Sequence, residues 1–408
     1  MKILWMSNRE IINNDISESG SWLVSMASLF QNKKEVELFN ITENSSVSAI
    51  IFKEKYNIRE WVMPRYKRET HGLPSNKDIE SILNIINSIN PDIIHIWGVE
   101  SYWGLLAKYG YIKGNILIDI QGSLYACHRV YMGGITLSSI FKVQHILKAL
   151  YTYMFISLQK FRMYKRLANE KLILRTINNI GVQSKWSKNK VQKLNENANF
   201  YNSPMALRDE FLNSSKWKLL EESMTIVTVV SPQAYKGVHV TLEALSLLKE
   251  RMPNIKLKII GDINKKSKKG YPLFLFDLIK KMKLDDNVIL LGSLNSREMI
   301  KEFFSSRALV ISSFVESYSL VLAEAMMLGV PCVVSYAGAM PELAEDERSA
   351  LYFPTGDAEE CAYKIERLLR SKNLSENLSK NSILKSEERH KQESVYKKQI
   401  QIYKEIIC

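Results

Sequence analysis

The sequence predicts an α/β protein with two doubly wound, Rossmann-like domains that face one another across a cleft. Three observations lead to this class. Short apolar strands alternate with amphipathic helices along the 408 residues, the alternation is lost between residues 202 and 223, and it then restarts. Such alternation predicts right-handed crossovers and parallel sheets with helices on both faces. Ligands of these sheets bind beyond the carboxyl ends of the strands.

The first half has short buried runs that predict strands and three-to-four-residue apolar spacing that predicts helices. Its expected elements are strands at 1–7, 35–41, 92–97, 115–120 and 179–183, and helices at 22–29, 76–90, 137–172 and 186–194. A loop with Gly20 separates the first strand from the first helix. Because periodicity is lost past residue 202, we expect a first domain at 1–205.

The second half repeats the pattern and predicts a second domain at 206–387. Its expected elements are strands at 225–230, 256–260, 288–291, 308–312 and 331–335, and helices at 240–252, 273–282, 297–305, 319–328 and 358–369. Two consecutive doubly wound halves therefore account for most of the chain.

The helix expected at 137–172 is amphipathic and basic. Its apolar side chains are Ile140, Val143, Leu147, Leu150, Met154, Leu158 and Phe161, and Lys142, Lys148, Lys160, Arg162, Lys165 and Arg166 flank them. Two interpretations stay open. The apolar stripe packs on the protein's own core, which is the commoner use of this pattern, or residues 140–166 lie on an anionic membrane surface.

Composition excludes disordered and fibrous classes, because 46% of the residues are hydrophobic and 24% are charged. The net charge of +13 favours anionic partners such as nucleotides, acidic glycans or anionic lipid. No base-reading motif points to nucleic acid. The longest uncharged run, 325–341, contains two glycines and two prolines and does not predict a membrane span.

The sequence also allows a prediction of the compartment and of the role of the cysteines. The apolar stretch at the N-terminus is too short for a secretory signal, so we expect a cytoplasmic protein, peripheral at the inner face of the plasma membrane if the membrane interpretation holds. The four cysteines lie far apart without CxxC spacing, which predicts neither a zinc site nor a disulfide framework.

The most informative stretch is 310–331, where a strand ends near Ser312 and a helix is expected to open near Ser319. Glu316 lies in the loop and Glu324 lies just over one turn into the helix. The start of a helix presents free N–H groups and the positive end of its dipole, which favours a phosphate there. One carboxylate on each side would accept hydrogen bonds from the hydroxyls of a sugar and of a ribose.

This stretch resembles the retaining glycosyltransferases of the GT-B fold, family 4, whose mark is two glutamates separated by seven residues. The match continues through Ala325, Met326, Gly329, Pro331, Val333, Val334, Ser335, Gly338, Pro341 and Glu342. Shorter matches lie at 235–238, 259–262, 291–292 and 91–95 and at the Gly20 loop. The resemblance implies that the first domain binds the acceptor, that the second binds a nucleotide sugar, and that a C-terminal helix at about 388–408 packs back on the first.

The resemblance also implies residue roles on the donor side. Glu316 would bind hydroxyls of the transferred hexose, Glu324 the ribose, and Lys236 the diphosphate. The remaining donor-binding positions would be Gly20, Ser231, Gly237, Gly261, Leu291, Gly292, Ser319, Leu320 and Val321. Gly20 would let the first loop approach the phosphates because it has no Cβ.

Acceptor contacts are expected at the strand ends of the first domain, at His95, Trp97, Asp119, Gln121 and His128. A core position is the commoner use of a histidine like His95, and packing is equally open for Trp97. Many relatives place a histidine near the reaction centre where this chain has Gln121, which cannot act as a general base. Relatives with Gln-Gly at this point carry a histidine a few residues later, which indicates His128.

Two further departures concern the donor side. Ser231 stands where the family often has an arginine for the phosphates, and Ser317 and Ser319 stand where it usually has glycines. The expected catalytic group is therefore Glu316, Lys236, His128 and Gln121.

The mechanism that the resemblance implies needs no strong protein base, because a donor phosphate oxygen can accept the acceptor's proton. No Asp-x-Asp occurs, so we expect neither a metal nor a cofactor beyond the donor, a UDP- or GDP-linked sugar. The expected function is transfer of a hexose to a lipid-linked or oligosaccharide acceptor in bacterial surface polysaccharide biosynthesis. The alternatives are a nucleotide-sugar epimerase or hydrolase of the same fold, and a catalytically silent scaffold that binds glycan or lipid.

Overall fold

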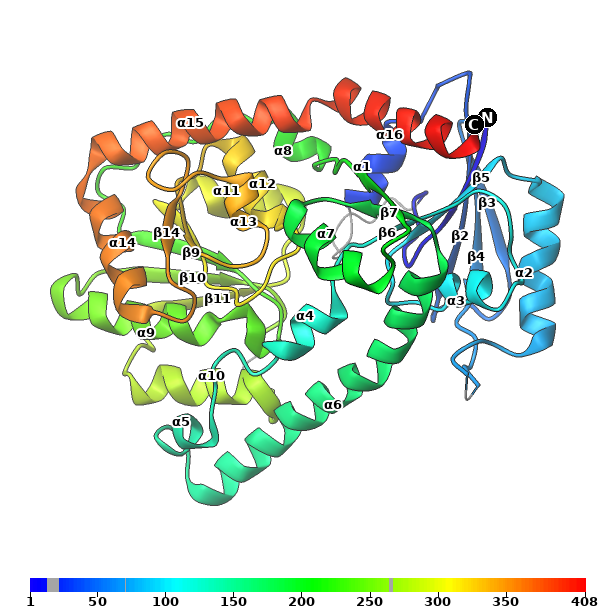
Figure 1. Ribbon diagram of the computed structural model, residues 1–408. Coiled ribbons are helices and arrows are strands. Elements are labelled where there is room, and N and C mark those ends of the chain that lie inside the picture. The colour runs from blue at the N-terminus through cyan, green and yellow to red at the C-terminus, as the bar shows by residue number, and fades with distance from the viewer. Residues whose placement is uncertain (13–21, 70, 264–266) are drawn as a thin grey trace. The chain divides into compact units, whose positions relative to one another are not determined.

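The computed structural model describes residues 1–12, 22–69, 71–263 and 267–408 (Figure 1). The chain forms two compact units. The first unit contains Met1–Leu124, Lys165–Arg208 and His390–Cys408, and the second contains Tyr125–Tyr164 and Asp209–Arg389. Gly20 lies outside the described residues.

The first unit is built on a sheet with eight strands among the described residues, in the order β3-β4-β2-β1-β5-β6-β7-β8. The strands are β1 (Lys2–Met6), β2 (Glu37–Asn44), β3 (Ile51–Lys55), β4 (Ile58–Pro64), β5 (Ile93–Trp97), β6 (Ile116–Asp119), β7 (Asn179–Val182) and β8 (Asn199–Asn202). Every neighbouring pair is parallel except β3 with β4. Because β2 and β5 lie on opposite sides of β1, the strand order reverses at β1 and β5, which is where such sheets bind ligands.

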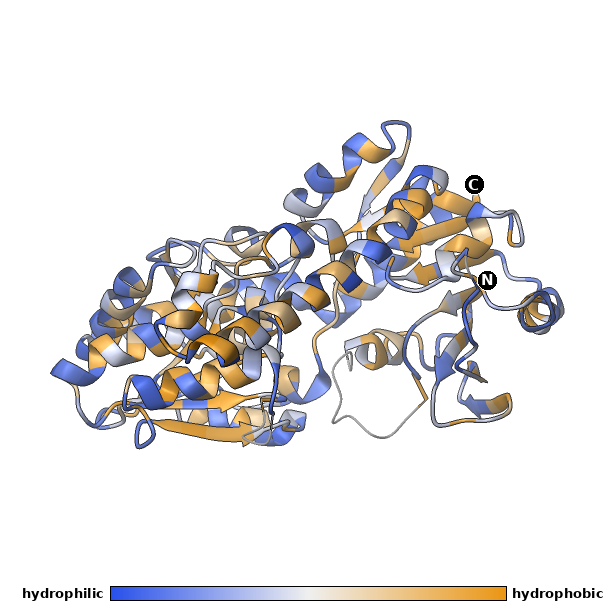
Figure 2. Cartoon of the chain, turned by 90° about the horizontal axis from the view of Figure 1, so that it is seen from below, coloured by the Kyte–Doolittle hydropathy of each residue, from blue (hydrophilic) through white to orange (hydrophobic). Residues whose placement is uncertain are grey.

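The second unit has a parallel sheet with six described strands, in the order β11-β10-β9-β12-β13-β14. They are β9 (Thr225–Val229), β10 (Lys256–Ile260), β11 (Val288–Gly292), β12 (Ala308–Ile311), β13 (Cys332–Ser335) and β14 (Leu351–Phe353). The strand order reverses between β9 and β12, which pair directly. Most sheet strands are hydrophobic along their length (Figure 2), as expected for sheets buried on both faces.

The helices connect these strands. Those preceding β9 are α1 (Trp22–Ser28), α2 (Asn76–Ile89), α3 (Trp103–Lys108), α4 (Leu124–Arg129), α5 (Leu137–Phe141), α6 (Ile146–Thr176), α7 (Lys185–Val191), the short 3₁₀ helix η1 (Gln192–Leu194) and α8 (Asp209–Asn213). Those following β9 are the short 3₁₀ helix η2 (Ala234–Lys236), α9 (Val238–Arg251), α10 (Gly270–Lys281), α11 (Ser296–Phe304), α12 (Leu320–Leu328), α13 (Met340–Leu343), α14 (Ala358–Arg370), α15 (Lys372–His390) and α16 (Gln392–Ile407).

The C-terminal helix α16 is held on the first unit by a buried tyrosine. The hydroxyl of Tyr403 accepts a hydrogen bond from Trp5 Nε1 at 2.9 Å and lies 2.7 Å from His95 Nδ1. Tyr403 and Trp5 are both fully buried. The last helix therefore completes the core of the unit that the first strand begins.

The segment expected as one helix at 137–172 differs from the prediction in two ways. It forms two helices, α5 and α6, with a break at 142–145, where Gln144 donates to Asp277 of α10 at 2.6 Å. Residues 125–164 also belong to the second unit, although the sequence placed them in the first domain. Ile140, Ala149 and Ile156 pack into the second unit's core, which explains this assignment.

The core interpretation of the apolar stripe is wrong for most of its length. Leu147, Leu150, Met154, Leu158 and Phe161 are exposed, and Leu147 exposes 83% of its surface. The opposite side of α6 is the one that packs on the second unit. Helix α6 therefore carries apolar side chains on both faces, and we call the exposed set the outer face of α6.

Candidate active site

The site begins where β9 and β12 end in the second unit. After β9 the chain forms η2 and turns into α9 at Gly237, whose φ is 69°. A Cβ at Gly237 would overlap the carbonyl oxygen of Ser312, which directly follows β12. Only glycine combines this positive φ with this close approach, so Gly237 brings the two loops together.

An ion pair joins the two loops. Lys236 Nζ lies 2.7 Å from Glu316 Oε1, and Ser313 Oγ donates to the same oxygen at 2.7 Å. The side chains of Lys236 and Glu316 are 25% and 14% exposed. Neighbouring groups therefore hold the pair in place, and solvent still reaches it. An anionic group of a ligand can replace Glu316 at Lys236, and a hydrogen-bond donor of a ligand can replace Lys236 at Glu316.

The backbone of Glu316 is held from its other side by the loop after β13. Ala339 N donates to Glu316 O at 2.8 Å. Gly338 has a φ of 59°, and a Cβ there would overlap the same carbonyl oxygen. Loops from three neighbouring strands thus position this one glutamate.

Helix α12 starts beside Glu316 with a residue in the left-handed region. Ser319, its N-cap, has φ 72° and ψ 77°, and its side chain makes no capping hydrogen bond within the described structure. This conformation is costly for any residue except glycine, which explains why the resembling family usually has glycine there. The amides of Leu320 and Val321 open the helix, where backbone N–H groups have no partner in the helix.

Glu324 lies one turn further along α12, on the same face as Leu320. It is buried and has interactions with its surroundings. Its place beneath the start of α12 fits the predicted role at a ribose, which stays a prediction.

The other donor-side positions lie at the same edge of the sheet. Ser231 follows β9, Gly261 follows β10, and Leu291 and Gly292 end β11. A Cβ at Gly261 would overlap Val230 O, whereas Gly292 borders open space. The structure therefore brings the described donor-side residues together at the carboxyl ends of four adjacent strands.

Sequence reasoning missed a supporting contact beneath this site. His239 of α9 is buried, its Nε2 donates to Gly133 O at 2.9 Å, and its Nδ1 lies 2.9 Å from the Tyr271 hydroxyl. Burial lowers the pKa of His239 to about 4, so the ring is neutral at pH 7. A Cβ at Gly133 would overlap Ala234 O of η2. The only signal in the sequence was the Gly133-Gly134 pair.

The two remaining candidates for catalysis lie in different units. Gln121 follows β6 in the first unit and is half-buried, whereas His128 of α4 belongs to the second unit. The ring of His128 lies 5.6 Å from that of Tyr164, and burial together with Lys160 lowers its pKa.

Three expected acceptor contacts lie in the core of the first unit, which corrects their expected place on the surface. His95, Trp97 and Asp119 are at most 1% exposed. His95 Nε2 lies 3.3 Å from Asp119 Oδ1, and the rings of His95 and Trp97 are 3.8 Å apart. His95 thus contacts Asp119, Trp97 and Tyr403, because strands β5 and β6 are central in the sheet.

The first unit has its open space elsewhere, in a pocket of about 960 Å³. The loops after β1, β2, β4 and β5 line it, together with one side of α6. None of the expected acceptor residues belongs to this lining. Within the described residues no three His, Cys, Asp or Glu side chains gather to hold a metal ion, and no helix is long and apolar enough to cross a bilayer.

Comparisons with known proteins agree with this geometry. The family model for glycosyl transferases group 1 matches residues 209–385, which contain the whole ion-pair site. Among curated proteins, an uncharacterized glycosyltransferase of Methanocaldococcus jannaschii is 26% identical over 169 residues, 41% of this chain and 42% of that one. The chain spans half or less of the first curated relatives' length.

Solved structures extend the likeness to the whole chain. Sucrose-phosphate synthase from Thermosynechococcus elongatus has a TM-score of 0.75 at 16% identity and covers 99% of this chain and 98% of its own. Anabaena HepE in complex with UDP-glucose has a TM-score of 0.68 at 13% identity and covers 100% and 99%. At such identities the likeness shows the fold, which is GT-B. The domain at 209–385 belongs to the group 1 glycosyltransferases.

Proposed function

We propose that this protein is a retaining hexosyltransferase that uses a UDP- or GDP-linked sugar and a lipid-linked or oligosaccharide acceptor. The observation that carries the proposal is the Lys236–Glu316 ion pair between β9 and β12, beside the start of α12. This is the point of the second sheet where the strand order reverses, and nucleotides bind at such points in doubly wound sheets.

The donor fits the charges at this point. The diphosphate would lie at the amides of Leu320 and Val321, where the helix dipole favours negative charge. Lys236 would leave Glu316 for the phosphates, and the freed carboxylate of Glu316 would accept hydrogen bonds from the hexose. The UDP-glucose bound to Anabaena HepE supports a nucleotide diphosphate sugar as the ligand class.

The chemistry would consist mainly of positioning and charge stabilisation. The acceptor oxygen forms its bond to the anomeric carbon on the face from which the diphosphate leaves, and a phosphate oxygen takes the acceptor's proton. Lys236 and the amides of α12 stabilise the charge that develops on the leaving diphosphate. In this proposal no metal is required, since these groups supply the positive charge.

Extraction of radiolabelled products tests the proposal. The purified protein is incubated with radiolabelled UDP-glucose, UDP-galactose or GDP-mannose and a bacterial lipid extract, without metal. We expect one donor to place label in the organic phase with its anomeric configuration retained, and Glu316→Gln to abolish this. Free sugar or an epimer formed without acceptor would favour the hydrolase or epimerase. No turnover of any donor would favour the silent scaffold.

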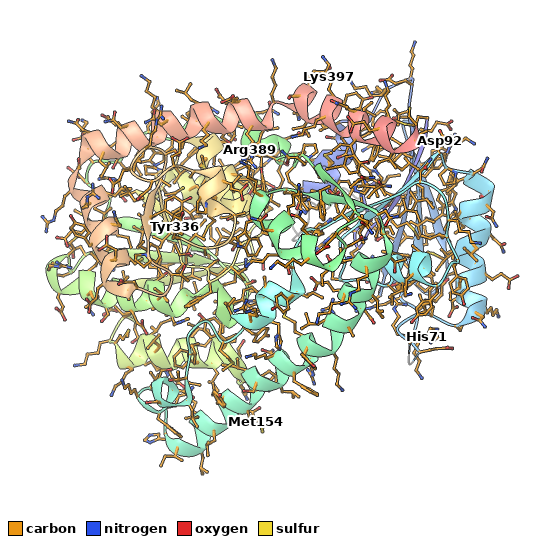
Figure 3. All side chains as sticks on the ribbon, viewed as in Figure 1. His71, Asp92, Met154, Tyr336, Arg389 and Lys397 are labelled. Atoms are coloured by element: carbon orange, nitrogen blue, oxygen red, sulfur yellow. The ribbon has the colours of Figure 1, made fainter. Side chains whose placement is uncertain are left out.

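The proposed acceptor side includes an anionic membrane surface at the outer face of α6. The exposed apolar side chains that support this are those of the outer face, together with Ile146, Tyr151 and Tyr164 of α6 and Phe141 at the end of α5. Met154 can be found on α6 in Figure 3. So many exposed apolar side chains on consecutive turns are rare on a soluble surface and mark an interaction site.

The charges around this face favour a bilayer with anionic lipid as the proposed occupant. Lys142 and Arg162 are exposed on the same segment, and Lys268 and Lys269 lie exposed just before α10. Lys269 Nζ lies 5.1 Å from the ring centroid of Phe155 on α6, so this basic loop borders the helix. An interfacial helix combines these features, with apolar side chains in the headgroup region and cations at anionic lipids. Such docking fits a role in surface polysaccharide assembly at the cytoplasmic side of the plasma membrane.

Sedimentation with vesicles tests the membrane proposal. We expect binding to phosphatidylglycerol-containing vesicles, weaker binding to pure phosphatidylcholine, and weakening by salt. The variant Leu147→Gln with Met154→Gln should lose most of this binding. The control Leu384→Gln, an exposed leucine on α15, should keep it. Equal binding by all three proteins, or self-association through the outer face instead, would contradict the proposal.

A further inference from the structure

The pocket of about 960 Å³ in the first unit has the position of a ligand site. Four of the loops that line it follow the adjacent strands β4, β2, β1 and β5. It therefore lies at the carboxyl edge of the sheet, where the strand order reverses. Because its described cations are all arginines, Arg9, Arg65, Arg68 and Arg166, we call it the arginine pocket.

Two of its carboxylates are already neutralised. Glu43 is paired with Arg68 and also accepts from the Tyr102 hydroxyl at 3.1 Å. Glu10 is paired with Lys53, which approaches it to 2.5 Å. These two pairs balance the charges of Glu43, Arg68 and Glu10, which leaves Arg65 and Arg166 beside the one other described carboxyl of the lining, Glu100.

The third carboxyl, Glu100, folds over Gly98 and lies next to Arg166. Burial raises its pKa and thereby favours its neutral form. Arg166 donates to the carbonyl oxygen of Glu100 at 2.9 Å, not to the carboxylate. Arg65 is exposed and has no ion pair with any residue that the structure describes. Among the residues that the structure describes, Arg65 and Arg166 thus offer guanidinium groups without a carboxylate hydrogen-bonded to them.

The remaining lining suits a sugar. The guanidinium of Arg68 lies 3.9 Å from the centroid of the Tyr102 ring, which makes a fixed wall. Amide and hydroxyl side chains form much of the rest, namely Asn8, Asn44, Ser45, Ser46, Ser101 and Asn169. Such groups donate to and accept from sugar hydroxyls, whereas arginine binds phosphate and carboxylate through paired N–H groups.

We propose that the arginine pocket binds a glycan that carries a phosphate or carboxylate group, with Arg65 and Arg166 as the ligands of that group. The inference rests on the proposed function in one respect, because in a glycosyltransferase this glycan is the acceptor. Binding of the anionic sugar itself requires only the pocket.

Calorimetric titration of the full-length protein tests the inference. The probes are glucose 1-phosphate, glucuronate, uncharged glucose and inorganic phosphate. The first two show whether the pocket prefers a phosphate or a carboxylate, and the last two show whether the sugar or the anion is sufficient for binding. The variants are Arg65→Gln with Arg166→Gln, and the control Lys67→Gln, which removes one charge from the same loop outside the pocket lining. UDP- and GDP-sugar binding is measured in every protein as an independent readout of the second unit.

We expect one charged sugar to bind more tightly than glucose and inorganic phosphate. The double variant should weaken its binding about tenfold for each arginine, while the control binds as the wild type does. Unchanged binding in the double variant, or equal binding of glucose, would overturn the inference even where nucleotide-sugar binding is intact. Loss of nucleotide-sugar binding from all proteins, with the anion effect intact, would instead count against the proposed function alone.

Discussion

The carboxyl edges of the two sheets differ in what forms them: backbone contacts in the second unit and side chains in the first. In the second unit the loops approach one another through backbone contacts that need glycine, and the ion pair Lys236–Glu316 joins them. In the first unit long polar side chains from four separate loops surround a large pocket. Close backbone contacts fix the shape of the second unit's edge, so that edge suits one ligand geometry. The edge of the first unit is formed by side chains, so a few substitutions can change which ligand it binds.

The largest effect expected from this difference is on catalysis. Lys236→Met should lower kcat/KM for the nucleotide sugar by about 10²- to 10³-fold, because in the proposed mechanism this cation stabilises the leaving diphosphate. Arg65→Gln should change the KM of the acceptor and leave donor binding intact. Steady-state kinetics with each substrate varied measures both. Lys281→Met, an exposed lysine of α10, is the matched control. If Lys236→Met lowered kcat/KM for the donor no more than Lys281→Met does, the proposed contrast between the two edges would be wrong.

A second test concerns the glycines of the second edge. Gly237→Ala should lower the free energy of unfolding by about 2 to 4 kcal/mol, because the methyl group overlaps Ser312 O and the φ is positive. Gly292→Ala has a similar φ of 72° but open space beside it, so about 1 kcal/mol is expected. Denaturant titration compares the two, and equal losses would show that the close approach contributes nothing.

The buried contact of His239 beneath the proposed donor site predicts a pH dependence of stability. The folded-state pKa of His239 is lowered from 6.5 to about 4, so the unfolded chain binds the proton more readily. Its stabilising contribution is present above pH 6.5 and is lost as the pH falls towards 4, by up to about 3 kcal/mol. The melting temperature of His239→Gln should depend less on pH in this window. A parallel decline in wild type and variant would contradict the assignment.

The smallest expected effect comes from Ser319. Replacement by glycine should raise the free energy of unfolding by about 1 kcal/mol, because Ser319 has a φ of 72°. The neighbouring Ser317→Gly lacks this positive φ and should give no gain. Thermal unfolding of both variants is the measurement, and destabilisation by Ser319→Gly would mean that its side chain has a role that outweighs the strain.

The same contrast explains what the sequence could predict. The strand-loop-helix at 310–331 is local, so the distance from Glu316 to the start of α12 follows from spacing alone, and the fold class follows from the alternation of strands and helices. The direct pairing of Lys236 with Glu316, 80 positions apart, needs the order of strands in the sheet.

The rest required the tertiary structure. The arginine pocket draws its residues from positions 8–169 without any local pattern. His95 and Asp119 resemble strand-end ligands in sequence but are central in the sheet, where Tyr403 covers His95. Edge strand β3 escaped prediction because its side chains are largely exposed and lack a clear buried face. The outer face of α6 was visible as a stripe, but periodicity does not show which of two apolar faces meets the core.

The most direct test of the central claim is calorimetric binding of UDP- and GDP-sugars, without metal, to the wild type, Lys236→Met and Glu324→Gln. A site at the start of α12 predicts saturable binding of one nucleotide series by the wild type and at least about tenfold weaker binding by both variants. The arginine-pocket variant should bind that donor as the wild type does. Binding that both variants retain at full strength would contradict the assignment of the donor site to this edge of the second sheet.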